Sequence, residues 1–102
     1  MKGYKVLIVE DDEKMNQGLL HVISKEGYAA QSVDSGERAL EQIKNIQFDL
    51  IISDFKLPGI NGMELLKATK KYDVNVLFIM ITAYGTVDTA VSAMKQGAED
   101  YI

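Results

Sequence analysis

Residues 48–54 read Phe-Asp-Leu-Ile-Ile-Ser-Asp, an apolar run that ends at the carboxylate of Asp54. The turn-forming residues 58–62, Pro-Gly-Ile-Asn-Gly, follow shortly after it. Apolar side chains at consecutive positions are typical of a parallel strand that is covered on both faces. The run therefore predicts a buried strand of an α/β sheet, with Asp54 at its carboxyl end.

Two other runs end in polar groups in the same way. Residues 6–9, Val-Leu-Ile-Val, lead into Glu-Asp-Asp at 10–12, and residues 76–81, Val-Leu-Phe-Ile-Met-Ile, lead into the hydroxyl of Thr82. Ligands of open α/β sheets bind at the carboxyl ends of the strands. Three strands that each deliver a polar group there indicate a functional site.

Strand-type and helix-type patterns alternate along the chain. Strands are expected near residues 4–9, 28–33, 48–53, 76–82 and 99–102. Right-handed crossovers between them predict an open, doubly wound parallel sheet of the α/β class. The second of these runs is more polar than the others, which suits an edge of the sheet.

Helical patterns fill the intervals between the strands. Two of the apolar stripes that are expected to face the core consist of Met15, Leu19, Val22 and Ile23, and of Val87, Ala90, Val91 and Met94. The spacing of Asn61 and Glu64 predicts a capping box at the start of the third helix. Gly27 and Gly97 occupy positions where helix C-caps are expected.

The composition is that of an ordinary globular domain. The 102 residues are 47% hydrophobic and 25% charged, which fits one domain with its own core. The formal net charge of −4 argues against direct nucleic-acid binding, and the absence of cysteine excludes disulfides and thiolate zinc sites. No apolar run is long enough to span a bilayer and the start shows no signal peptide, so we expect a cytoplasmic protein.

The clustered carboxylates predict a divalent cation, because they repel one another unless something cationic lies among them. Mg²⁺ prefers oxygen ligands and is commonly held by one or two carboxylates plus a phosphate. Asp11 and Asp54 could both reach one ion, and a backbone carbonyl of residues 55–57 could supply another ligand. Zinc would require His or Cys, and the one histidine, His21, falls in the middle of a predicted helix.

With a cation bound, one carboxylate can act as a nucleophile toward phosphorus. Asp side chains form covalent aspartyl-phosphates, and phosphoryl transfer needs mainly positioning and charge neutralisation from the protein. The hydroxyl of Thr82 can then donate a hydrogen bond to a phosphoryl oxygen. These residue types in this pattern therefore favour phosphoryl transfer to Asp54.

A purely structural interpretation competes with this one, because carboxylates that precede helices are often N-caps. Taken alone, Glu10 and Asp11 favour capping, and for Asp12 capping and function are equally good interpretations. Asp54 is different because it precedes a loop that contains proline and glycine. The agreement of three strand ends favours the functional interpretation.

Four motifs in this order resemble the receiver domain of bacterial two-component response regulators, over the chain from Lys5 to Ile102. They are Val-Leu-Ile-Val-Glu-Asp-Asp-Glu (6–13), Asp-Leu-Ile-Ile-Ser-Asp-Phe-Lys-Leu-Pro-Gly-Ile-Asn-Gly-Met-Glu-Leu-Leu (49–66), Ile-Thr-Ala-Tyr-Gly (81–85) and Gly-Ala-Glu-Asp-Tyr-Ile (97–102). Residues 83–98 are similar to receivers of the nitrogen-regulator, enhancer-binding type. The resemblance implies a flavodoxin-like sheet of five strands in the order 2-1-3-4-5.

The resemblance also implies a role for each residue of the site. Asp54 would accept a phosphoryl group from a phosphohistidine of a sensor histidine kinase, with Thr82 as the switch hydroxyl and Tyr101 as the switch aromatic. The implied magnesium ligands are Asp11, Asp54, the backbone carbonyl of Lys56, Glu10 through a water molecule, and Asp12 as a further candidate. The domain would catalyse only its own phosphorylation and dephosphorylation and would control an output domain, most simply a transcriptional one.

One departure from the family pattern concerns the end of the sequence. Receivers carry a lysine, a proline and a last helix after the fifth strand, whereas this sequence ends at Ile102. Residues 1–102 are therefore expected to be a receiver domain that lacks its last helix. We expect weakened phosphorylation and a tendency to form a homodimer through the uncovered face of the sheet.

Three other functions remain to be compared with this one. A receiver-like dimerisation module that is never phosphorylated is the main alternative. A magnesium phosphatase with an aspartyl nucleophile usually has a second Asp where this chain has Lys56, and it needs a cap domain. A flavodoxin-like cofactor carrier would need a phosphate-binding loop after the first strand, where this chain has acidic residues.

Overall fold

The structure is a computed structural model, and it describes residues 3–81 and 87–102 apart from the side chains of residues 87, 88 and 101. The strands are β1 (Lys5–Val9), β2 (Ala29–Val33), β3 (Leu50–Asp54), β4 (Leu77–Ile81) and β5 (Asp100–Tyr101). The helices are α1 (Glu13–Lys25), α2 (Gly36–Asn45), α3 (Gly62–Tyr72) and α4 (Val87–Lys95). None of the helices in the described residues is long and apolar enough to cross a membrane.

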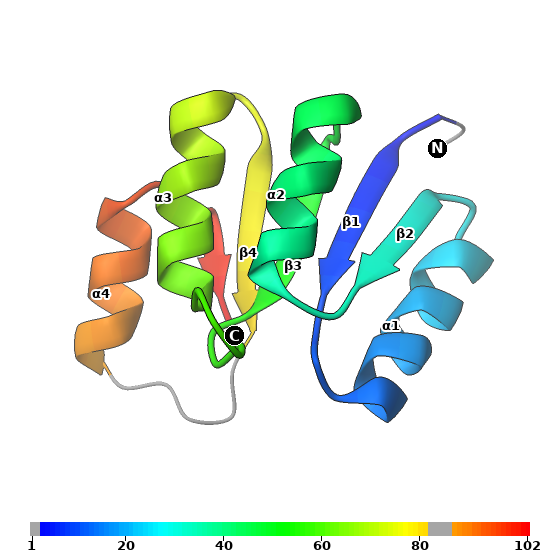
Figure 1. Cartoon of the computed structure of the whole chain (residues 1–102), viewed down its shortest axis with the longest axis horizontal. Helices are drawn as coiled ribbons and strands as arrows, with labels where there is room; N and C mark the ends of the chain where they lie inside the picture. The colour runs from blue at the N-terminus through cyan, green and yellow to red at the C-terminus, as the bar shows by residue number, and fades with distance from the viewer. Residues whose placement is uncertain (1–2, 82–86) are drawn as a thin grey trace.

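The five strands form one parallel sheet in the order β2-β1-β3-β4-β5 (Figure 1). This order confirms the predicted doubly wound fold and places the polar strand β2 at an edge. The register pairs Val9 with Ser53 and Asp54 with Ile81, so β1, β3 and β4 end at the same edge of the sheet.

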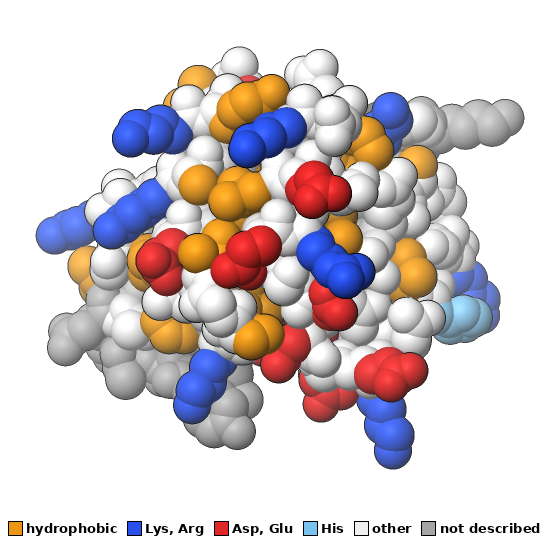
Figure 2. Space-filling view, in the orientation of Figure 1, with side chains coloured by type: hydrophobic (Ala, Val, Ile, Leu, Met, Phe, Trp, Pro, Cys, Tyr) orange, Lys and Arg blue, Asp and Glu red, His pale blue; other side chains and the backbone are white. Residues whose placement is uncertain are grey.

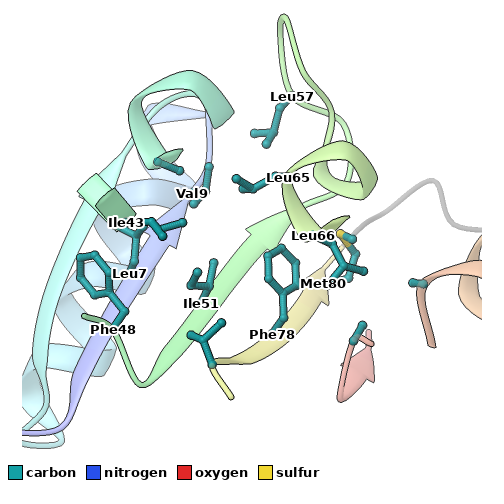
Figure 3. Close-up of a cluster of buried hydrophobic side chains, with 14 residues drawn as sticks. Leu7, Val9, Ile43, Phe48, Ile51, Leu57, Leu65, Leu66, Phe78 and Met80 are labelled. Carbon is teal, nitrogen blue, oxygen red and sulfur yellow. The ribbon is translucent and has the colours of Figure 1, made fainter. Parts of the chain in front are cut away.

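Helices cover the sheet in two layers. In Figure 1, α2 and α3 lie in front of the central strands, and buried side chains from α2, α3 and α4 share one core with that face of the sheet. Phe78, Leu7 and Ile51 are among its largest fully buried side chains (Figure 3). On the other face, α1 packs Leu20 and Ile23 against a smaller cluster around the buried strands. Alternate residues of each strand therefore serve the two layers.

The expected apolar stripes of two helices are partly wrong. Met15 and Val22 of α1 are 52% and 58% exposed, and the inward side of this helix instead carries the buried Asn16. Val91 and Met94 of α4 are also exposed. Leu19 and Ile23 of the predicted α1 stripe do pack against the core. The other members are exposed because apolar residues lie on both sides of a helix that buries only one side.

Local signals in the sequence are confirmed where helices begin and end. Asn61 and Glu64 form the predicted capping box, with each side chain accepting a hydrogen bond from the other residue's backbone N–H. Gly27 and Gly97 have φ angles of +97° and +107°, the left-handed conformation that favours glycine after a helix. The strands start one or two residues later than predicted. Phe48 and Val76 are apolar and buried, but they precede the first residues that pair in the sheet.

Candidate functional site

Three carboxylates meet at the carboxyl edge of the sheet. Glu10 and Asp11 directly follow β1, and Asp54 is the last residue of β3. Because β1 pairs with β3, the three side chains meet, and one carboxylate oxygen from each lies within 4.8 Å of the other two. The structure thus brings together residues that are far apart in the sequence and that the sequence predicted to form one site.

Glu10 is the most buried member of the cluster, with 7% of its surface exposed. Burial raises the pKa of its carboxyl from 4.5 to about 7, and the negative charges of Asp54 and Asp11 add to this effect. The backbone N–H of Asp12 donates a 3.0 Å hydrogen bond to Glu10 Oε2 and opposes the rise. Glu10 therefore carries a proton over part of the neutral pH range when no cation is present.

Asp54 is half-buried beside Glu10 and Asp11. Burial raises the pKa of its carboxyl, and the charge of Asp11 raises it further. The backbone N–H of Lys56 donates a 3.3 Å hydrogen bond to Asp54 Oδ1, which favours the ionised form and fixes one oxygen. Hydrogen bonds with the backbone of Phe55 and the side chain of Glu10 also favour the ionised form of Asp54.

The chemistry of this cluster suits a hard divalent cation. Burial disfavours the charged form of Glu10 and of Asp54. Each of the three carboxylates could offer one oxygen ligand to an ion. A cation would compensate both the burial and the mutual repulsion, and Mg²⁺ is the ion that one or two carboxylates usually hold. Figure 2 shows that Asp and Glu side chains gather in the lower half of the view, toward the carboxyl ends of the strands.

The loop between β3 and α3 is held close to the cluster by a glycine. The backbone N–H of Gly62 donates a 2.8 Å hydrogen bond to the carbonyl of Phe55, which closes the loop at its base. A Cβ at Gly62 would lie 2.5 Å from the carbonyl oxygen of Asp54 and 2.8 Å from the sulfur of Met80. Only glycine lets the first turn of α3 approach the site strand this closely.

Asn16 is a site residue that the sequence reasoning missed. Its side-chain amide donates hydrogen bonds to the carbonyls of Glu10 at 2.9 Å and Val33 at 3.0 Å, which ties the loop after β1 to the end of β2. The available signal was a polar residue in phase with Leu20 and Ile23, the apolar residues that α1 turns inward.

Of the remaining predicted site residues, the structure describes two, Asp12 and Lys56. Asp12 caps α1, since its Oδ1 accepts a 3.1 Å hydrogen bond from the N–H of Met15, and it is not one of the three clustered carboxylates. Lys56 lies in the loop that borders the same depression as Glu10, Asp11, Asp12 and Asp54. Thr82 and the side chain of Tyr101 lie outside the described part of the chain.

Comparison with known protein families gives a match over residues 6–102, to the response regulator receiver domain. The chain belongs to this family. Receiver domains are regulatory domains, and the predicted resemblance is thereby confirmed. The match includes Glu10, Asp11 and Asp54, the three carboxylates that the fold brings together.

Curated relatives cover nearly all of this receiver domain. It is 41% identical over 98 residues to the response regulator protein FleR of Pseudomonas aeruginosa. The aligned residues make up 96% of this chain and 21% of FleR. It is 37% identical over 98 residues to sporulation initiation phosphotransferase F of Bacillus subtilis, which is 96% of this chain and 79% of that protein. The chain thus spans about a fifth of FleR and most of the smaller relative.

Solved receiver structures share the fold closely. A CheY-like receiver domain protein from Methanospirillum hungatei gives a TM-score of 0.93 at 32% identity, covering 96% of this chain and 78% of that one. The response regulator TrrA from Thermotoga maritima, solved in complex with Mg²⁺-BeF, gives a TM-score of 0.88 at 29% identity, with 100% and 85% coverage.

Proposed function

We propose that this receiver domain, residues 1–102, is a phosphorylation switch of a two-component system in which Asp54 accepts the phosphoryl group. The observation that carries the proposal is the convergence of Glu10, Asp11 and Asp54, with an oxygen from each within 4.8 Å of the others. In a receiver domain, such a cluster joins a nucleophile to the ligands of a cation.

The transfer step uses the Asp54 oxygen that the Lys56 N–H does not engage. This carboxylate oxygen attacks phosphorus, a new O–P bond forms, and the bond from phosphorus to the donor breaks with its electron pair on the leaving group. The leaving group is the imidazole of a kinase histidine, or acetate when acetyl phosphate is the donor. The product is an aspartyl-phosphate on Asp54. Attack of water on its phosphorus breaks the O–P bond, releases inorganic phosphate and regenerates the carboxylate.

Mg²⁺ would be held by Asp11, Asp54 and the backbone carbonyl of Lys56, with Glu10 acting through a water molecule. When bound, it would supply positive charge to neutralise the phosphoryl oxygens. The similarity to TrrA, which was solved with Mg²⁺-BeF, supports this assignment. Asp12 is a weaker candidate ligand, because its side chain caps α1. We assign the switch hydroxyl to Thr82 and the switch aromatic to Tyr101 on the family pattern alone.

The partners follow from this role. The phosphoryl donor is a sensor histidine kinase in the cytoplasm. The response is carried by an output domain, for which transcriptional control is the simplest assignment, since the transcriptional regulatory protein FixJ of Rhizobium meliloti is 33% identical to this chain over 102 residues. The domain catalyses only its own phosphorylation and dephosphorylation.

Pairing of two copies through the sheet face beside α1 is also proposed, because Leu77 on that side is 41% exposed.

The test is phosphorylation by acetyl phosphate, followed by intact-protein mass spectrometry with and without Mg²⁺. We expect magnesium-dependent addition of one phosphoryl group to the wild type and none to Asp54→Asn. Asp49→Asn is the matched control, since it makes the same change at an exposed position just before β3. Labelling that persists in Asp54→Asn, or that ignores Mg²⁺, would contradict the proposed site.

A further inference from the structure

The first turn of α2 is in direct contact with the loop that follows Asp54. Oε2 of Glu37 accepts a 3.1 Å hydrogen bond from the backbone N–H of Ile60. Glu37 and Ile60 belong to separate segments, 23 residues apart. This contact therefore connects the helix after β2 to the loop after β3, and it uses a charged acceptor, which makes a backbone hydrogen bond stronger.

The shapes of the two segments fit one another around this hydrogen bond. A Cβ at Gly36 would lie 2.5 Å from Cγ1 of Ile60 and 3.2 Å from its carbonyl oxygen, so the helix backbone touches the loop. Gly59 has a φ of +73°, and a Cβ there would overlap the carboxylate of Glu37. Glycine at both positions permits the close approach that places the carboxylate on the Ile60 N–H.

The same loop is fixed at two other points, and both belong to the site. The hydrogen bond from Gly62 to Phe55 closes its base. The hydrogen bond from the Lys56 N–H to Asp54 Oδ1 orients the carboxylate. The tip of the loop, residues 58–60, lies between these anchors, and Glu37 supplies the anchor at the tip from a different element.

We infer that Glu37 is a positioning residue for the phosphoacceptor site. By fixing the loop through Ile60, it sets the orientation of the Lys56 peptide, whose N–H binds Asp54 and whose carbonyl is assigned to the cation. This inference rests on the proposed function of Asp54. Outer-shell groups of this kind hold metal ligands in the geometry that the ion requires.

Three variants separate the hydrogen bond of Glu37 from its charge. Glu37→Ala removes both, Glu37→Gln keeps an acceptor oxygen without the charge, and Glu41→Ala makes the same charge change one turn further along α2, where the side chain is exposed. The measurements are Mg²⁺ affinity by calorimetry, the rate of labelling by acetyl phosphate, thermal stability, and the amide resonances of Lys56 and Ile60.

We expect Glu37→Ala to weaken Mg²⁺ binding and slow labelling by roughly three- to tenfold, the range for loss of one typical hydrogen bond, because this contact is exposed to solvent. The Mg²⁺ affinity and labelling rate of Glu37→Gln should stay within about twofold of the wild type, and those of Glu41→Ala should equal the wild type. Gly59→Ala, which displaces the carboxylate, should act in the same direction as Glu37→Ala, and the double variant should lose less than the product of the two effects.

Three results would overturn the inference. The first is a labelling rate and an Mg²⁺ affinity of Glu37→Ala that equal those of the wild type. The second is a loss in Glu37→Gln as large as that in Glu37→Ala, and the third is an amide resonance of Lys56 that Glu37→Ala leaves unchanged. A wild-type chain that takes up no phosphoryl group would instead remove the proposed function itself, and the role of Glu37 with it. The wild-type and variant arms thus distinguish the two failures.

Discussion

The side-chain nitrogen of Asn16 lies 2.9 Å from the carbonyl oxygen of Glu10 and donates a hydrogen bond to it inside the protein. Asn16 is only 6% exposed. We expect Asn16→Ala to lower the free energy of unfolding by about 2 kcal/mol, because the buried carbonyl loses its partner. Urea unfolding measures this, with Lys14→Ala as an exposed control in the same helix. Equal midpoints for the two variants would disprove the role of Asn16.

Gly62 and Gly18 offer a matched pair of glycine substitutions. A Cβ at Gly62 would meet the carbonyl oxygen of Asp54 at 2.5 Å, whereas a Cβ at Gly18 would meet nothing within 4 Å. We expect Gly62→Ala to destabilise the fold by about 1–3 kcal/mol through overpacking. Gly18→Ala should stabilise α1 by up to about 1 kcal/mol. Thermal melts check both, and a shift of the same sign in the two variants would contradict the explanation.

The raised pKa of Glu10 predicts a pH dependence for the protein without divalent cations. Its carboxyl has a pKa of about 7 in the folded state and 4.5 ordinarily, so the folded state binds more protons between these values. Stability from this group therefore falls as the pH rises from about 4.5 to about 7. Glu10→Gln should remove that part of the decline.

Denaturant unfolding at a series of pH values, in a chelator, measures this effect. The control is Glu13→Gln, which makes the same change at an exposed position in the first turn of α1. Added Mg²⁺ should restore stability to the wild type near pH 7 by mass action. The cause would be refuted by wild-type and Glu10→Gln stabilities that run parallel between pH 4.5 and 7.

Glu99 attaches the start of β5 to its neighbours. Its Oε2 accepts a 2.5 Å hydrogen bond from the N–H of Phe78, and its Oε1 lies 2.9 Å from Nζ of Lys70. We expect Glu99→Ala to speed hydrogen exchange at the Phe78 amide and to cost about 1–2 kcal/mol of stability. Gln96→Ala, at a nearby exposed side chain, serves as the control. Unchanged protection of Phe78 would show that the carboxylate is dispensable.

The sequence predicted the sheet and its polar edge well, because consecutive apolar residues in short runs have few structural alternatives. Asp54 and residues 10–12 each end such a run, so their meeting follows once the strands are parallel and adjacent. The capping box of Asn61 was equally predictable, since both of its hydrogen bonds are local.

Contacts between distant segments could not be predicted in this way. The hydrogen bond from Ile60 to Glu37 depends on how α2 approaches the loop after β3, and no short-range pattern encodes that approach. Half of the predicted α1 stripe is also wrong, because Met15 and Val22 are apolar but exposed, while Asn16 is polar and buried. A buried amide that binds backbone carbonyls breaks the periodicity on which the prediction relied.

The pairing of β1 with β3 joins segments that are separated by α1, β2 and α2. A nascent polypeptide that has emerged only as far as α2 contains Glu10 and Asp11 but not yet Asp54. The repulsion between Asp54 and the other two carboxylates thus arises only when β3 docks, which is a long-range event. The acidic groups therefore oppose the docking of β3 onto β1 rather than the pairing of β1 with β2, and the ionic medium around a newly made chain acts on that docking step.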